Sequence, residues 1–94
     1  MIRSTASFAS DKAARYLVQL CKHFAHKVPA VYDESEGRVD FPWGVCRLVA
    51  GEGRLDMTCE ADDAEALKRV EAVVRDHVER FAWRDKPQLD WQPG

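Results

Sequence analysis

Hydrophobic residues recur along this chain with two different periods, and each period predicts one kind of element. Apolar and polar residues alternate, as in strands with one buried face, over residues 2–8, 38–43, 46–50 and 54–60. Residues 28–32 add a short strand, in which Pro29 favours an edge position. Apolar residues spaced three and four apart predict amphipathic helices over 10–27 and 62–84. The predicted order is therefore β-α-β-β-β-β-α.

This order predicts an α+β fold in which an antiparallel sheet carries two helices on one face and water on the other. Polar or glycine-containing turns separate the strands at residues 33–37 and 51–53. Pro42 and Gly44 interrupt the ladder and predict a bulge or a bend. After the second helix, residues 88–91 predict a short edge segment, with Leu89 and Trp91 packing back on the core.

The helix over residues 62–84 has the clearest apolar stripe. His77 falls inside this stripe in angle, so it is expected at the margin of the core. Asp62 and Asp63 are natural N-caps, because a short carboxylate accepts the free N–H groups of the first turn. The stripe itself consists of Leu67, Val70, Val74, Val78 and Phe81.

The helix over residues 10–27 has an apolar face and a cationic one. Ser10 is its expected N-cap. Pro29 forbids continuation, so the helix is expected to end near His26 or Lys27. Its polar side carries Lys12, Arg15, Gln19, Lys22, His23 and His26, with Tyr16 at the border.

Composition is that of one globular domain spanning residues 1–94, with 32% charged residues and a net charge of −2. The charge is uneven, since residues 1–27 hold five basic residues against one acidic one. The acidic overall balance argues against a nucleic-acid partner. No apolar run approaches a membrane span and no signal segment opens the chain, so we expect no membrane partner and a cytoplasmic location.

The cysteines and two of the histidines raise the question of a metal site. Cys21, Cys46 and Cys59 are widely spaced on apolar-facing positions, which is typical of buried reduced thiols. Cys21 and His23 point to opposite sides of a helix. His23 and His26 share the polar side and are the most that the sequence offers to a metal, too few for a structural zinc. Solvated histidines on a basic face explain them as well.

His77 allows two interpretations. A histidine in an apolar arc loses solvation, and a hydrogen-bond partner usually compensates at the edge of a core. Alternatively, it lies on a pocket floor and binds a ligand, with Arg80 and Arg84 holding an anionic group. The sequence contains no catalytic signature such as a nucleophile elbow, a P-loop or a zincin motif, and it indicates no particular cofactor.

Three segments together resemble a bacterial family known as domain of unknown function 2218: residues 15–27 (RYLVQLCKHFAHK), 41–44 (FPWG) and 76–84 (DHVERFAWR). The likeness runs nearly end to end. It implies a small cytoplasmic bacterial protein, similar to a domain appended to siderophore-interacting flavoproteins, and hence a link to iron or haem. No catalytic role comes with the family. The family pattern is matched here at Arg15, Tyr16, His23, His26, His77, Arg80 and Arg84.

Two functions are expected from these observations. The first is a non-enzymatic accessory domain that binds an anionic or metal-bearing ligand in iron metabolism, with a siderophore-interacting flavoprotein as partner; its residues are His77, Arg80, Arg84, His23, Tyr16 and Arg15. The second is an interaction module that docks an acidic protein on the helix over residues 10–27 through Lys12, Arg15, Lys22, His26 and Lys27. An enzyme fragment that needs a flavoprotein partner is a third, weaker possibility.

Overall fold

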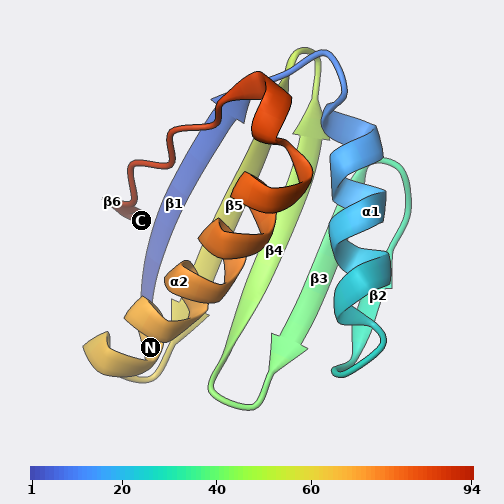
Figure 1. Ribbon diagram of the computed structural model, residues 1–94. Coiled ribbons are helices and arrows are strands. Elements are labelled where there is room, and N and C mark those ends of the chain that lie inside the picture. Colours follow the sequence, from blue (N-terminus) through green and yellow to red (C-terminus); the bar gives the residue numbers. More distant parts are fainter.

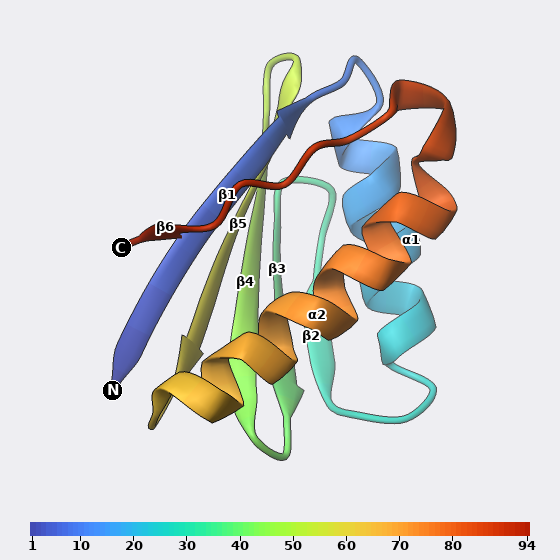
Figure 2. The same cartoon turned by 60° about the vertical axis from the view of Figure 1, so that its left-hand side comes forward.

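A computed structural model describes residues 1–94. Two helices, α1 (Ala13–Phe24) and α2 (Ala64–Phe81), lie on the same face of a six-stranded antiparallel sheet (Figures 1 and 2). The α+β arrangement predicted from the sequence is confirmed, with a 3₁₀ turn added after α2 and the predicted C-terminal edge segment present as a sixth strand. The strands are β1 (Ile2–Ala9), β2 (Ala30–Tyr32), β3 (Glu36–Phe41), β4 (Gly44–Gly51), β5 (Arg54–Ala61) and β6 (Gln92–Pro93), and the 3₁₀ turn is η1 (Trp83–Asp85).

The strand order is β2-β3-β4-β5-β1-β6, so β2 and β6 form the two edges. The edge position expected for the strand containing Pro29 is confirmed, although β2 begins only at Ala30. The N-terminal strand β1 pairs with β5 from Ile2 to Ala9. Because β1 inserts between β5 and β6, the two ends of the chain meet at one edge of the sheet (Figure 1).

The β3–β4 connection differs from the predicted bulge or bend. Phe41 pairs directly with Gly44, so Pro42 and Trp43 form a two-residue hairpin turn. Proline has no N–H to offer a ladder, and this favours a turn at its position. A Cβ on Gly44 would lie 2.5 Å from Val70 Cγ2 and 2.6 Å from the Glu60 backbone oxygen. Glycine therefore allows β4 to approach α2.

The apolar residues that alternate along the strands lie in the core, as predicted. The central residues of β3, β4 and β5 that face the helices are 0–2% exposed, and they pack in one core with the apolar stripes of α1 and α2. The three cysteines are free and buried among them, as predicted. The fully or almost fully buried residues include Leu17, Leu20, Cys21, Val39, Cys46, Leu48, Leu55, Met57, Cys59, Val70, Val74 and Val78.

The outer face of the sheet is less uniformly wet than the alternation predicts. Glu60 is only 8% exposed although its side chain points away from the helices. Arg3 and Arg47, on the neighbouring strands, pair with its carboxylate at 3.4 and 3.0 Å and cover it. Ion pairs with neighbouring strands thus bury the Glu60 carboxylate. The sequence of one strand alone does not reveal this burial, because the partners belong to other strands.

Both helices are shorter than predicted. α1 begins at Ala13 because Ser10 belongs to the preceding turn, where its Oγ accepts the Lys12 N–H at 3.0 Å. α1 ends at Phe24, and residues 25–27 form a turn before Pro29. Neither helix is both long and apolar enough to cross a bilayer.

α2 begins as predicted but ends early. Asp63 is its N-cap, with the side chain accepting the Ala66 N–H at 2.8 Å. The helix ends at Phe81 because Ala82 leaves helical geometry and the chain turns into η1. In η1, Asp85 accepts a 2.7 Å hydrogen bond from Ser10 Oγ, which draws this segment towards the start of α1. The predicted end near Arg84 is therefore wrong by about one helical turn.

The C-terminal edge segment lies slightly later than predicted. β6 pairs Gln92 and Pro93 with Thr5 and Ser4, whereas the sequence favoured residues 88–91. Leu89 and Trp91 do pack against the core, as predicted.

Candidate functional site

A concave pocket of about 280 Å³ lies where the end of α1, the β3–β4 turn and the middle of α2 meet. The end of α1 and the β3–β4 hairpin lie at the same end of the molecule (Figure 1). The volume is just below the ~300–1,000 Å³ usual for small-molecule sites. We call it the aromatic pocket; it is lined by His23, Phe24, Lys27, Val28, Phe41, Pro42, Trp43, Val73 and His77.

Aromatic rings form one wall of the pocket. The rings of Phe41 and Trp43 stack at 4.9 Å with only 4° between their planes. Phe24 meets Phe41 edge-on at 5.2 Å, and the Arg69 guanidinium lies 4.7 Å from the Trp43 ring centre. The hairpin turn brings the two stacked rings to one end of the sheet. The wall therefore offers apolar aromatic edges to the pocket, with a cation over Trp43.

His77 has the hydrogen-bond partner that its position in an apolar arc predicts. Its Nδ1 donates to the Val73 backbone carbonyl one turn earlier, at 2.7 Å. The carbonyl can only accept, so the proton lies on Nδ1 and Nε2 carries the lone pair whenever the ring is neutral. The half-buried ring also contacts Phe24, with centres 4.6 Å apart. His77 is thus both a satisfied residue at the core margin and part of a pocket lining.

His23 pairs with His77 rather than with His26. The two imidazole centres are 4.9 Å apart, and the His23 ring also meets Phe81 edge-on at 5.3 Å. Desolvation by the rings packed around it lowers the pKa of His23, and the neighbouring His77, His26, Arg80 and Lys27 lower it further. His26 lies beyond the end of α1 and is exposed, outside the pocket lining.

The two arginines predicted to act with His77 lie in different places. Arg80 lies close enough to His23 to lower its pKa. Arg84 belongs to η1, where its guanidinium lies over the exposed Trp83 ring at 5.1 Å, and it does not line the pocket. The sequence placed Arg84 beside His77 by extending α2 three residues too far.

Tyr16 and Arg15 also lie away from the aromatic pocket. Tyr16 is buried, and its ring packs against Phe8 at 6.1 Å. Burial raises the pKa of Tyr16, and its hydrogen bond to the Asp85 carboxylate raises it further. Tyr16 therefore joins η1 to α1. Arg15 is exposed on the outer side of α1.

The cationic face of α1 borders a second, more open hollow. Lys12, Arg15 and Lys22 line it together with Phe81. None of these three cations belongs to an ion pair. Lys27, predicted to act with them, lines the aromatic pocket instead.

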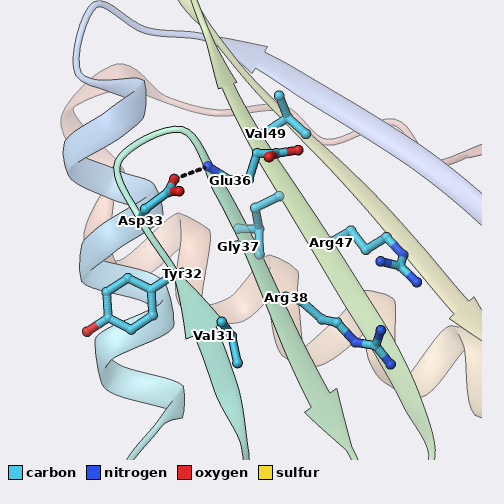
Figure 3. Close-up of a pocket in the computed structure, with 9 residues that line it drawn as sticks. Val31, Tyr32, Asp33, Glu36, Gly37, Arg38, Arg47 and Val49 are labelled. Atoms are coloured by element: carbon cyan, nitrogen blue, oxygen red, sulfur yellow. Dashed lines mark hydrogen bonds between the residues drawn. The ribbon is translucent and has the colours of Figure 1, made fainter.

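A third hollow lies on the outer face of the sheet (Figure 3). Arg38 and Arg47 stand directly opposite each other on β3 and β4 within it. Arg38 pairs with Asp40 at 2.9 Å and Arg47 with Glu60 at 3.0 Å. Because both charges are already paired, this hollow is a weaker candidate for an anionic ligand.

Sequence reasoning missed the aromatic side of the pocket. Phe24 was expected only on the apolar face of the first helix, and Phe41 and Trp43 only as inward-facing residues of the strand over 38–43. The signal was the proline between Phe41 and Trp43, which marks a turn and places two aromatic side chains at a hairpin end. No group of three or more histidine, cysteine or acidic side chains is clustered as metal ligands usually are.

Comparison with known families assigns the chain to one of them. Residues 5–92 match the profile of a family described as "Uncharacterized protein conserved in bacteria (DUF2218)". The chain belongs to this family. This match confirms the resemblance found in the sequence. The matched residues include all those that line the three hollows described above.

One solved structure of similar fold is that of PA4090 from Pseudomonas aeruginosa, determined by NMR. It aligns with a TM-score of 0.84 and 34% sequence identity, over 99% of this chain and 97% of the other. A comparison with curated proteins found no significant match.

Proposed function

We propose that this domain is a non-enzymatic binding domain that holds a small, planar, negatively charged ligand in the aromatic pocket. The observation that carries the proposal is the meeting of the stacked Phe41 and Trp43 rings with two imidazoles around one concavity. An apolar wall with a few convergent polar groups is the usual form of a small-molecule site.

Charge supports an anionic ligand. Lys27 lines the pocket, and Arg69 covers Trp43 at its edge. Arg80 lies near His23. None of the three cations belongs to an ion pair, so their charges are free to stabilise a carboxylate or phenolate.

Size and family resemblance narrow the ligand. A pocket of about 280 Å³ suits one or two aromatic rings. We extend the proposal to iron metabolism because of the resemblance to domains appended to siderophore-interacting flavoproteins. A ferric chelate with aromatic arms would insert one ring here, while haem would enter only by an edge. A flavoprotein reductase is the partner that fits this role. The compartment that we propose is the cytoplasm, where three unpaired cysteines remain reduced.

Titration calorimetry with 2,3-dihydroxybenzoate, its ferric complex and haem tests the proposal, with tryptophan fluorescence as a second readout. We expect saturable binding at micromolar concentration to one or more of these probes. Trp43→Leu and Lys27→Ala should each weaken it about tenfold, a loss of ~1.4 kcal/mol. His26→Ala is the matched control because His26 is exposed outside the pocket.

Two results would contradict the proposal. One is the absence of saturable binding of every probe up to millimolar concentration. The other is binding that is equal in the wild type and in both pocket variants, because the ligand would then lie elsewhere.

The cationic face of α1 supports a second function, the docking of an acidic protein. Three cations without ion-pair partners flank Phe81, and Trp83 beyond it is 63% exposed. Exposed tryptophan beside free cations is typical of an interaction surface. Pull-down from a bacterial lysate at two salt concentrations tests this. A partner should bind the wild type at low salt and be lost in Lys12→Glu/Arg15→Glu/Lys22→Glu.

A further inference from the structure

Two chemically versatile side chains meet across the helices, His23 on α1 and His77 on α2. Their ring centres are 4.9 Å apart and their planes are inclined by 48°. Both rings line the aromatic pocket, so solvent and ligands reach the space between them and the aromatic wall. The pair arises only from the packing of two helices.

The spacing fits coordination of one ion by both rings. A bound zinc lies ~2.0–2.1 Å from an imidazole nitrogen, which sets each ring centre ~3.2 Å from the ion; at ~90–110° around the ion, two ring centres are then ~4.5–5.2 Å apart. The observed 4.9 Å falls within this range.

The Val73 carbonyl orients His77 as a ligand. Histidines that bind metals usually donate their other ring N–H to a carbonyl or a carboxylate, which fixes the tautomer and the ring direction. His77 makes this bond through Nδ1 at 2.7 Å. The nitrogen left for coordination is Nε2.

We propose that His23 and His77 provide the two protein ligands of a site for one divalent transition-metal ion, Ni²⁺, Cu²⁺ or Zn²⁺. Water or donor atoms of a pocket ligand fill the remaining positions. Two imidazoles without a carboxylate select these ions over Mg²⁺ and Ca²⁺, which prefer oxygen ligands. Lys27 and Arg80 oppose a bare cation, so the affinity for metal alone is weaker than that of a four-ligand structural site.

The test is calorimetric titration of the untagged protein with NiCl₂ at fixed pH, complemented by electron paramagnetic resonance of a Cu²⁺-loaded sample. We expect one equivalent of Ni²⁺ per chain and nitrogen hyperfine structure in the Cu²⁺ spectrum. His23→Ala and His77→Gln should each weaken Ni²⁺ binding at least tenfold. His26→Ala, the control for the sequence-based pair of His23 and His26, should change it less than twofold.

Because His23 is exposed, His23→Ala keeps the test valid even if His77→Gln fails to fold, which circular dichroism reveals. The proposal is overturned if the wild type shows no saturable binding, if His23→Ala binds as the wild type does, or if His26→Ala loses as much as His23→Ala. The inference shares its pocket with the proposed function but stands on the metal alone. A wild type that binds the aromatic acids but no metal refutes this site only. A wild type that binds metal but none of the aromatic acids refutes the proposed function only.

Discussion

At the residue scale, His77 shows how one side chain serves packing and a site together. Its Nδ1 is tied to the Val73 carbonyl, and its ring face packs against Phe24. The bond satisfies the polar edge of the ring in a half-buried position. The remaining nitrogen is left for whatever enters the pocket.

Replacing His77 by alanine should therefore destabilise the protein by ~1–3 kcal/mol, because it removes ring packing and a satisfied hydrogen bond. His26→Ala, at an exposed position, should cost less than ~0.5 kcal/mol. Urea denaturation of both variants at neutral pH measures the difference. Equal stabilities would mean that His77 has no role at the core margin.

Gly44 provides a second prediction at this scale. A methyl group at this position meets Val70 Cγ2 at 2.5 Å and the Glu60 carbonyl oxygen at 2.6 Å, and backbone cannot yield as a flexible side chain does. Gly44→Ala should cost ~1–3 kcal/mol or more through overpacking. Gly51→Ala is the control, since its nearest such neighbour is 3.8 Å away. A loss of stability in both variants alike would exclude the packing explanation.

At the element scale, the ends of the two helices depend on each other. Asp85 in η1 accepts a hydrogen bond from Ser10 at 2.7 Å and another from Tyr16. These contacts hold the segment after α2 against the beginning of α1. They explain why α2 gives way to a 3₁₀ turn.

The same contacts predict a pH dependence. The hydrogen bonds from Ser10 and then Tyr16 lower the pKa of Asp85 in the folded state. A lowered folded pKa means that the stabilisation is present above the unfolded value of ~3.9 and is lost as pH falls through the folded pKa. Asp85→Asn should therefore be less stable than the wild type at pH 6, and the difference should shrink towards zero near pH 2.

Thermal unfolding between pH 2 and pH 7 measures this difference. Asp90→Asn, which changes an exposed carboxylate with no ion-pair partner, should leave the pH profile of stability unchanged. A constant difference between Asp85→Asn and the wild type at every pH would contradict the assignment.

At the scale of the whole molecule, the three cysteines come from α1, β4 and β5 and are buried in one core. Cys46 and Cys59 are direct partners across neighbouring strands. Burial raises the pKa of Cys21 to about 11. The side-chain interaction with Cys59, and then burial, raises the pKa of Cys46. Thiolate, the reactive form, is therefore scarce in the folded protein.

We expect none of the three thiols to react with Ellman's reagent at pH 8 except through unfolding. The reaction rate should follow the unfolded fraction as urea is added, because the thiols become accessible only on global opening. Absorbance at 412 nm follows the reaction. A thiol that reacts within seconds in native buffer would show that the core opens locally around it.

Much of this architecture was predictable because the spacing of apolar residues within one element reflects which of its faces is buried. The stripe from Leu67 to Val78 and the alternation of Leu55, Met57 and Cys59 each identify an element and its buried face without knowledge of the rest. The cap at Asp63 and the partner required by His77 follow from local chemistry in the same way. Element order, helix faces and the reduced state of the cysteines were determined at this level.

Tertiary structure alone decided which residues form the site. His23 meets His77 because two helices pack side by side, and Trp43 joins them because antiparallel register makes Pro42 the centre of a hairpin turn. Arg84 lies outside the site because Asp85 accepts a hydrogen bond from Ser10, a residue far away in the sequence, and this contact turns the chain away from the axis of α2. Periodicity describes one element at a time, whereas a pocket depends on distances between elements, which are determined by the joint packing of the core.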